Sequence, residues 1–235
     1  RVSLALEPKR ILPCADPEGR GALASLGCAI EAAASIADVE FAPLPDHGRD
    51  GAVGTLHVRG LHEARFARNL GLLHRRATNR HPYQRVHVAD ALASACLAGA
   101  ALPGTHVRFA QPCRKTLRAL TAQGALRLFR RDDYLAELLD HLRFGEREER
   151  ASGSGMTPRG LALGRAEALA LRLLRASAPL RKVAGRLGLG HAMAANAARC
   201  IARSGGFVLV TADSAGAQAC LDGGRTLMRA WMQFA

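Results

Sequence analysis

Aromatic residues and long apolar runs are both scarce in this chain. Only 4% of its 235 residues are Phe, Trp or Tyr, although 49% are apolar. The core must therefore consist mainly of Leu, Val and Ala, and alanine and leucine favour helix over sheet. No stretch of 18 uncharged apolar residues occurs, which excludes a membrane-spanning helix. Residues 1–9 contain no apolar core, so we expect no signal peptide. The composition predicts a mainly α protein with short strands, of the α+β class.

The motifs of common metal sites and enzymes are also missing. The six cysteines form no CxxC pair, and none has a histidine at zinc-finger spacing. We expect reduced, mostly buried thiols. No HExxH, GxSxG, Walker loop or GxGxxG occurs. We therefore expect no cofactor, no metal and no catalysis. Seven of the nine histidines fall between His47 and His106, and with Asp46 and Asp50 they leave a metal-dependent hydrolase as a lesser alternative.

Acidic residues are too few to balance the basic ones. The chain has 20 Asp and Glu against 33 Lys and Arg, a net charge of +13, and its pI is about 10.8. Lysine occurs only at positions 9, 115 and 182. A GC-rich genome explains arginine in place of lysine, but it does not explain the excess of basic over acidic residues. A pI above 9 is typical of a protein that binds a polyanion, most often nucleic acid.

The charge alternates along the chain. Residues 1–59 carry a net charge of −2, residues 60–131 carry +11, residues 132–157 carry −4 and residues 158–235 carry +8. Compositional bias alone would not produce this alternation. Within the acidic stretch, residues 145–157 are first charged and then rich in Gly and Ser, which predicts a linker.

This charge pattern predicts that the chain is organised in four consecutive parts. We expect an N-terminal segment over 1–59, a basic helical domain over 60–144, the linker over 145–157 and a C-terminal domain over 158–235. In the N-terminal segment we expect a helix over 20–37 and strands over 39–42 and 53–59. Its acidic balance makes it a poor nucleic-acid surface, so its expected role is to dimerise or to complete the first domain.

The C-terminal block has the clearest order of elements. Thr157 and Pro158 predict the start of a helix that runs to about Ala176. Pro179 begins a second helix that ends near Leu187, and residues 188–190 break it. A third helix is expected over 191–204, followed by a strand over 207–211. Residues 218–221 are a candidate return strand, and residues 226–234 are expected to form a final helix.

This order over 158–211 resembles winged helix-turn-helix DNA-binding proteins. The residues that carry the resemblance are 183–190, Ala197, Ile201 and 205–208. The resemblance implies that the third helix enters a major groove, with Ala197 and Ile201 towards the core. The opposite face would then bind DNA through His191, Ala192, Ala195, Asn196, Arg199 and Arg203. Asn can read adenine and Arg can read guanine in that groove.

A weaker resemblance to the same family covers residues 84–131. We expect one helix over 84–99, a recognition helix over 112–124 and, after Gly124, a first wing strand over 125–129. Arg114, Lys115 and Arg118 would project from that helix and choose bases. On the wing, close to phosphates, the same resemblance places Arg127, Arg130 and Arg131.

Upstream, residues 61–76 are expected to form a helix with a strongly basic side. Glu63 is the only acidic residue in this region. We predict a phosphate-contacting face made of Arg65, Arg68, Arg75, Arg76 and Arg80.

Together these patterns predict a bacterial-type protein that binds double-stranded DNA with one or two winged helices. A transcriptional regulator and a plasmid-type replication initiator both fit, with a cytoplasmic, nucleoid-associated location. The alternative is an interaction adaptor that docks through the leucine face of residues 135–142. A sequence-indifferent RNA binder is a third interpretation, although few aromatics argue against base stacking. The helix over 133–144 and the tail helix are candidate seams of a homodimer.

Overall fold

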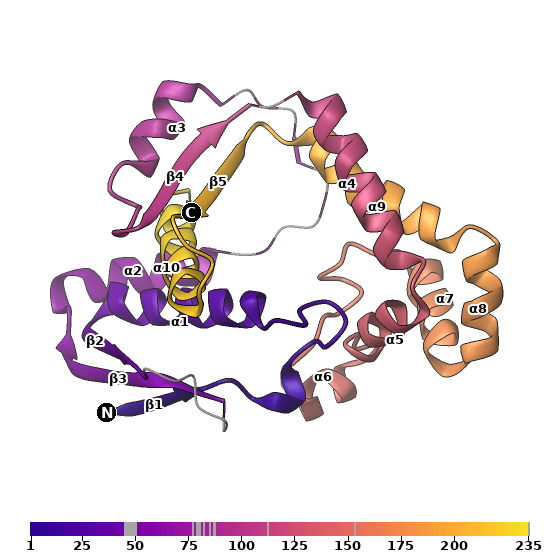
Figure 1. The fold of residues 1–235 in the computed structure, drawn as a ribbon, viewed down its shortest axis with the longest axis horizontal. Helices are drawn as coiled ribbons and strands as arrows, with labels where there is room; N and C mark the ends of the chain where they lie inside the picture. Colours follow the sequence, from indigo (N-terminus) through magenta and orange to yellow (C-terminus); the bar gives the residue numbers. More distant parts are fainter. Residues whose placement is uncertain are drawn as a thin grey trace. The chain divides into compact units, whose positions relative to one another are not determined.

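The computed structural model describes residues 1–44, 51–76, 78, 81, 83, 84, 86, 88–111, 113–152 and 154–234. The fold is mainly helical, at 57%, with short antiparallel strands, which confirms the expected α+β class. In the described part, no helix has the length and apolar character needed to cross a membrane. The chain divides into two compact units (Figure 1). Unit 1 comprises Arg1–Ala77, Val88–Ala110 and Val208–Ala235, and unit 2 comprises Thr78–His87 and Gln111–Phe207. These units are discontinuous, unlike the four consecutive parts that the charge pattern predicted.

Unit 1 contains a three-stranded antiparallel sheet with strand order β1-β3-β2. Its strands are β1 (Val2–Ala5), β2 (Ala37–Pro43) and β3 (Ala52–Leu61), and a short 3-10 turn follows β1 at Pro8–Arg10. Leu56 of β3 is the register partner of Val2 on one side and of Phe41 on the other. The two strands predicted for this segment are confirmed, and each is longer than predicted.

Helices α1 (Arg20–Ile36) and α10 (Ala217–Gln233) pack against each other in unit 1. Leu23 and Ile30 of α1, Leu221 of α10, and Val53 and Leu56 of β3 form the main core. The predicted helix over 20–37 is confirmed. The predicted return strand over 218–221 is wrong, because this segment is the first turn of α10, and there Leu221 is fully buried.

The rest of unit 1 consists of α2 (Glu63–Arg75), α3 (Asp90–Leu97), β4 (Thr105–Ala110) and β5 (Phe207–Ala212). Strands β4 and β5 form a two-stranded sheet, next to a small core of Leu97, Ala100 and Ala230. The strand predicted over 207–211 is therefore confirmed, but its partner is β4 instead of a wing strand that follows it. The helix predicted over 84–99 is shorter than expected, since α3 begins only at Asp90.

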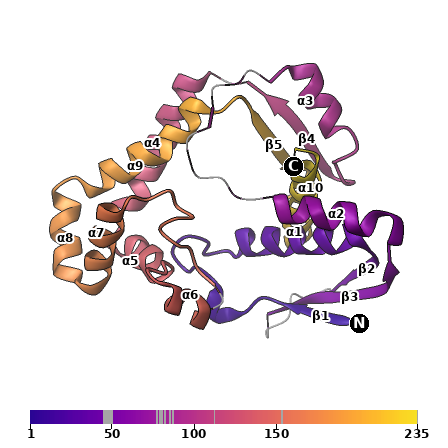
Figure 2. The same ribbon diagram turned by 180° about the vertical axis from the view of Figure 1, so that it is seen from behind.

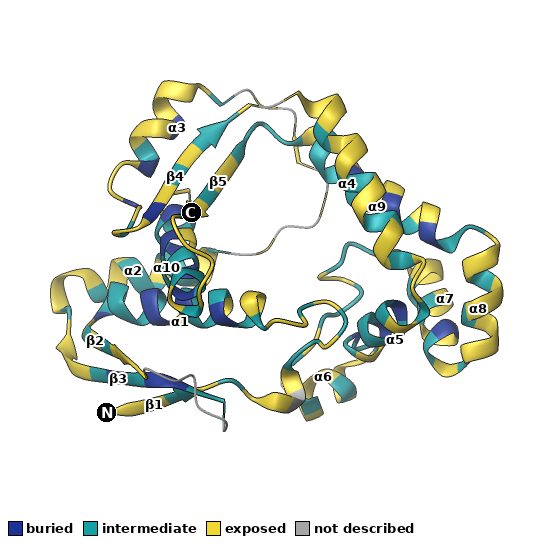
Figure 3. Ribbon diagram, in the orientation of Figure 1, coloured by how far each residue is buried: buried dark blue, intermediate teal, exposed yellow. Residues whose placement is uncertain are grey.

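Unit 2 is made of six helices in the described residues: α4 (Arg114–Phe129), α5 (Asp132–Asp140), α6 (Glu146–Ser152), α7 (Arg165–Ala176), α8 (Ala178–Arg186) and α9 (Leu189–Arg203). Its core is formed by Leu135, Leu139, Leu142 and Leu174. These leucines are at most 5% exposed. Figure 3 shows the buried residues as short stripes on largely exposed helices.

The burial of these leucines bears on two functional predictions. The leucine face of 135–142 is not an exposed docking surface, because Leu135, Leu139 and Leu142 are buried against α7 and its neighbours. Each candidate dimer seam also contributes to the core of its own unit, α5 through these leucines and the tail helix through Met228 and Ala230. The homodimer itself stays a prediction.

The first wing strand predicted over 125–129 is also absent, because α4 continues through Gly124 to Phe129. Ala125, Leu126 and Phe129 are half-buried at helical spacing and extend the side of α4 that packs on α9. A Cβ atom at Gly124 would have no heavy atom within 4 Å, so this glycine is on an open side of the helix.

Residues 145–157 do not form a linker. They contain α6, and a bridge joins Leu142 to Met156. Arg175 of α7 holds Glu148 of α6 through two hydrogen bonds of 2.9 and 3.2 Å, and its guanidinium lies 4.8 Å from the centre of the Phe144 ring. The charged residues that suggested a solvated connection are thus partners of a neighbouring helix. Helix α7 starts at Arg165 instead of Pro158, where Glu167 accepts a hydrogen bond from the Gly164 N–H.

Candidate nucleic-acid interface

Helices α8 and α9 follow each other in unit 2, separated only by Leu187 and Gly188. The Ser177 hydroxyl caps α8 by accepting a hydrogen bond from the Leu180 N–H, and Pro179 occupies the first turn, as predicted. Gly188 has a φ of 98°, a left-handed conformation that favours glycine. The chain therefore turns at Leu187 and Gly188, and α9 begins at Leu189. The predicted break is confirmed, although Gly190 belongs to α9.

One half-buried ion pair fixes α8 against α5 in unit 2. Arg181 donates from Nε to Asp132 Oδ1 at 2.7 Å and from Nη2 to Oδ2 at 3.3 Å. The Arg181 side chain is 12% exposed. Its hydrogen bonds lower the pKa of Asp132. This bidentate pair joins α8 to the first turn of α5 and thereby sets the position of the turn that presents α9.

Helix α9 has two distinct faces. Gly190, Ala194 and Ala198 are buried at a spacing of four residues. On the other side, all six residues that were predicted to face DNA are exposed: His191, Ala192, Ala195, Asn196, Arg199 and Arg203. Ala197 and Ile201, which were predicted to face the core, are half-buried. The amphipathic pattern of α9 was therefore predicted correctly.

Helix α4 packs along α9 (Figures 1 and 2). A Cβ atom at Gly190 would lie 3.5 Å from Leu126 Cδ1 and from the Phe129 carbonyl oxygen. The first turn of α9 is therefore beside the last turn of α4, and the two helices run in opposite directions. The small residues of the buried α9 stripe allow this close packing.

At that end the structure brings together two predicted site residues, Arg130 immediately after α4 and His191 in the first turn of α9. Arg130 Nη2 lies 3.3 Å from His191 Nε2, and both residues are exposed. Arginine only donates hydrogen bonds, so Arg130 donates and His191 Nε2 accepts. The structure thus places a hydrogen-bonding arginine and a histidine at the junction of α4 and α9.

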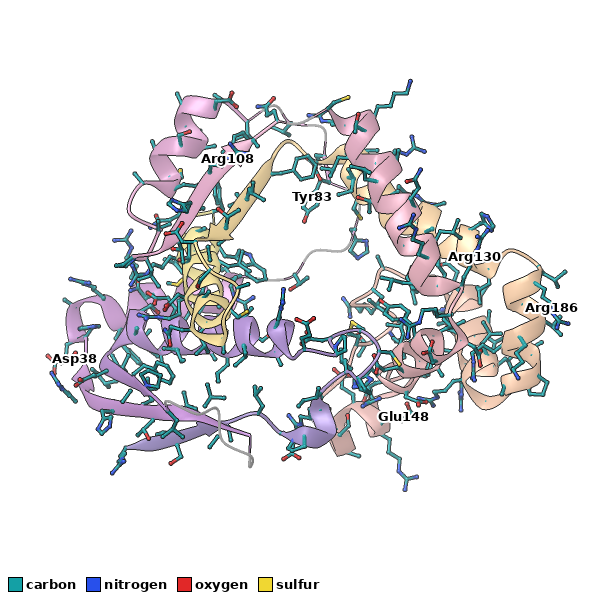
Figure 4. All side chains as sticks on the ribbon, viewed as in Figure 1. Asp38, Tyr83, Arg108, Arg130, Glu148 and Arg186 are labelled. Atoms are coloured by element: carbon teal, nitrogen blue, oxygen red, sulfur yellow. The ribbon has the colours of Figure 1, made fainter. Side chains whose placement is uncertain are left out.

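Acidic residues are absent from the helices that form this surface. Helices α4, α8 and α9 contain nine arginines and lysines and no Asp or Glu. Among these nine, Arg181 alone forms an ion pair with a described residue. The exposed residues without such a partner are Arg114, Lys115, Arg118, Arg127, Lys182, Arg186, Arg199 and Arg203. In Figure 4 the Arg186 side chain extends outward from α8.

The acids of unit 2 instead lie on α5, α6 and α7, where several are paired. Arg131 donates to Asp133 at 2.7 and 3.1 Å, Arg150 pairs with Glu146, and Glu148 binds Arg175. Arg131 was predicted to contact phosphate from a wing, but it is bound to its own acidic neighbour. The positive charge of α4 and α9 is therefore not balanced on these helices.

The basic face predicted upstream belongs to unit 1. Arg65, Arg68 and Arg75 are exposed on α2, as expected. Arg76 differs: its guanidinium lies over the Trp231 ring at 4.4 Å, and its buried Nε has no hydrogen-bond partner among the described residues. Arg80 lies outside the described residues.

The alternative catalytic group also lies largely outside the described residues, which do not include Asp46, His47 and Asp50. In the described ranges, no group of three or more His, Cys, Asp or Glu is placed to hold a metal ion.

Gln123 is one residue of this surface that sequence reasoning did not identify. It is exposed on α4, seven residues before Arg130 and therefore on nearly the same side of the helix. If the helix had been predicted to continue through Gly124, Gln123 would have been expected on the same side of it as Arg130, two turns earlier.

No protein family model, curated protein or solved structure matches this chain. A functional assignment therefore rests on the geometry and charge of the chain itself.

Proposed function

We propose that this protein binds double-stranded DNA through the helix-turn-helix formed by α8 and α9. The observation that carries the proposal is the exposed face of α9, which presents Asn196, Arg199 and Arg203 beside helices without acidic residues. A helix of this kind, presented after a short turn, fits the major groove. Binding without catalysis is typical of a transcriptional regulator or a replication initiator, the two classes that we retain.

Affinity would come chiefly from phosphate neutralisation. Besides Arg199, five exposed cations on α4 and α9 lack an ionic partner among the described residues: Arg114, Lys115, Arg118, Arg127 and Arg203. Each phosphate contact contributes about −0.9 to the slope of log K against log salt. Five contacts would weaken binding by roughly 500-fold between 50 and 200 mM salt.

Specificity would come from the polar groups of α9. An asparagine can form two hydrogen bonds with adenine, and an arginine can form two with guanine. Asn196 and Arg199 are exposed on the same face of α9, with alanines at 192 and 195 beside them. Each bidentate contact would discriminate by about 1–3 kcal/mol against other bases.

The test is fluorescence anisotropy of a random 30-base-pair duplex at 50 and 200 mM salt. We expect binding at 50 mM and a steep loss at 200 mM. The variant Arg118→Gln/Arg203→Gln should reduce the salt slope by about 1.8. The matched control is Arg165→Gln/Arg172→Gln, which removes two exposed arginines from α7 and should leave the slope unchanged. No binding of the unmodified protein at 50 mM salt would overturn the proposal.

A further inference from the structure

Helices α4 and α9 together are too wide to enter one groove of DNA. A helix with its side chains is about 10–12 Å in diameter, and packed helix axes lie about 8–10 Å apart. The stripe of Gly190, Ala194 and Ala198 permits a short separation, but the pair still spans about 20 Å. The major groove is about 12 Å wide. If the protein binds DNA as proposed, only one of the two helices can reach the base edges.

The contact between Arg130 and His191 identifies the side of α4 that adjoins the exposed face of α9. Residues 15, 11 and 7 positions before Arg130 share that side at 3.6 residues per turn. They are Lys115, Ala119 and Gln123, and all three are exposed. The shared surface therefore has a long cation near each end of α4, with Ala119 and Gln123 between them.

The antiparallel packing also sets the heights, along the helix axes, of the side-chain amides of Gln123 on α4 and Asn196 on α9. Gly190 lies beside Phe129. Gln123 is six residues before Phe129, and Asn196 is six residues after Gly190, so each is about 9 Å along its helix from this contact. Two exposed amides therefore lie at the same level on adjacent helices. Because one groove admits one helix, at most one of these amides can read a base pair in that groove.

The side chains around these two amides differ in length, and this difference indicates which of the two helices enters the major groove. On α9, Asn196 adjoins Ala192 and Ala195, which project little and allow the helix axis to approach the bases. Alanine can also contact the thymine methyl group. On α4, Lys115 and Arg130 are about 22 Å apart along the axis. Long cations at this spacing reach phosphates over about six nucleotides of one strand.

We propose that α9 alone enters the major groove while α4 lies along the flanking phosphate strand. Asn196 then sets a preference for an A·T pair, and Lys115 and Arg130 bind phosphates without choosing bases. Gln123 donates its amide N–H to a phosphate oxygen. This division rests on the proposed DNA binding, and it replaces the sequence-based expectation that α4 also reads bases.

The experiment selects preferred sites from a duplex library with 20 randomised base pairs and sequences the bound pool. The variants are Asn196→Ala, its matched amide control Gln123→Ala, and Lys115→Gln/Arg130→Gln. All replaced side chains are exposed, and a thermal melt of each variant checks folding. We expect Asn196→Ala alone to lose a preferred A·T position. The double variant should keep the preference, reduce the salt slope by about 1.8, and bind every duplex on the order of 10- to 100-fold more weakly.

Three outcomes would overturn the inference. In the first, Gln123→Ala or the double variant changes the preferred site while Asn196→Ala does not, which would make α4 the reading helix. In the second, the unmodified protein binds DNA with a preferred site that no variant alters. In the third, the unmodified protein binds no duplex at 50 mM salt. Only this last result also rejects the proposed function, so the two failures are distinguishable.

Discussion

Two adjacent glycines of α10 should respond in opposite ways to the same substitution. A Cβ atom at Gly224 would lie 1.9 Å from the Ala24 carbonyl oxygen and 2.7 Å from its carbonyl carbon. Both atoms belong to the backbone of α1, so no side-chain rotation can relieve the overlap. A Cβ atom at Gly223 would have no heavy atom within 4 Å.

The expected loss of stability follows from the displacement of the two helices that Gly224→Ala requires. Ordinary contact needs a separation of about 3.4 Å, so α1 and α10 must part by roughly 1.5 Å near this point. That movement loosens the packing of Leu221 against Leu23 and Ile30. Overpacking in a core costs about 1–3 kcal/mol, and a backbone-to-backbone overlap is at or above the upper end. The higher helix propensity of alanine returns only about 1 kcal/mol. We expect a net loss of at least about 2 kcal/mol.

Urea unfolding followed by tryptophan fluorescence measures this loss in unit 1. The chain has one tryptophan, Trp231, which is in α10. Gly223→Ala should raise the free energy of unfolding by about 0.5–1 kcal/mol, because it gains helix propensity without a clash. Equal stability of the Gly224→Ala variant and the unmodified protein would refute the reasoning, as would a Gly223→Ala variant that is equally destabilised.

Three further predictions concern charged and reactive side chains. The buried carboxylate of Glu31 accepts hydrogen bonds from two arginines of α10 at 2.6 and 3.1 Å, so Glu31→Gln should lower the stability reported by Trp231 by about 2–4 kcal/mol. Hydrogen bonds from the side chain and backbone of Thr116 lower the pKa of the exposed Cys113 thiol, whereas burial raises the pKa of the Cys28 thiol. Because the thiolate is the reactive form, iodoacetamide should label Cys113 well before Cys28 at pH 7, as measured by mass spectrometry. Arg175 lowers the pKa of Glu148 from 4.5 to about 2. The ion pair therefore contributes its full stabilisation of the fold above pH 4.5 and loses it as the pH falls towards 2. In urea titrations between these pH values, the free energy of unfolding of the Glu148→Gln variant should depend less on pH than that of the unmodified protein.

The periodicity of apolar residues was sufficient to predict a helix and its exposed side where one face of that helix is buried along its whole length. The apolar spacing of residues 20–37 predicted α1, and the pattern of residues 191–204 predicted which side of α9 is exposed. In both segments the buried residues recur every three to four positions, which is the signal that a helix leaves in a sequence. The exposed face of the candidate interface could therefore be predicted from the sequence.

Local signals failed where a distant segment decides the outcome. Gly124 looked like a helix stop, yet α4 continues because Ala125, Leu126 and Phe129 gain a partner in α9, some 65 residues away. Residues 145–157 looked like a solvated linker because their partner, Arg175, lies on another helix. The strand at 207–211 was predicted correctly, but its pairing with β4 joins segments about 100 residues apart. Propensity carries no information about such partners.

The same limit applies to charge, and it bears directly on the site. A count along the sequence treats all arginines of a block alike, and Arg76, Arg118 and Arg131 were all predicted to contact DNA. The structure separates them by their neighbours: an aromatic ring lies under Arg76, an aspartate holds Arg131, and Arg118 has no ionic partner among the described residues. An arginine already bound to a carboxylate has to give up that partner before it can neutralise a phosphate, so it contributes less to a salt-dependent affinity. Substitution of Arg131 should therefore change the salt slope less than substitution of Arg118, although the sequence gives no reason to distinguish them.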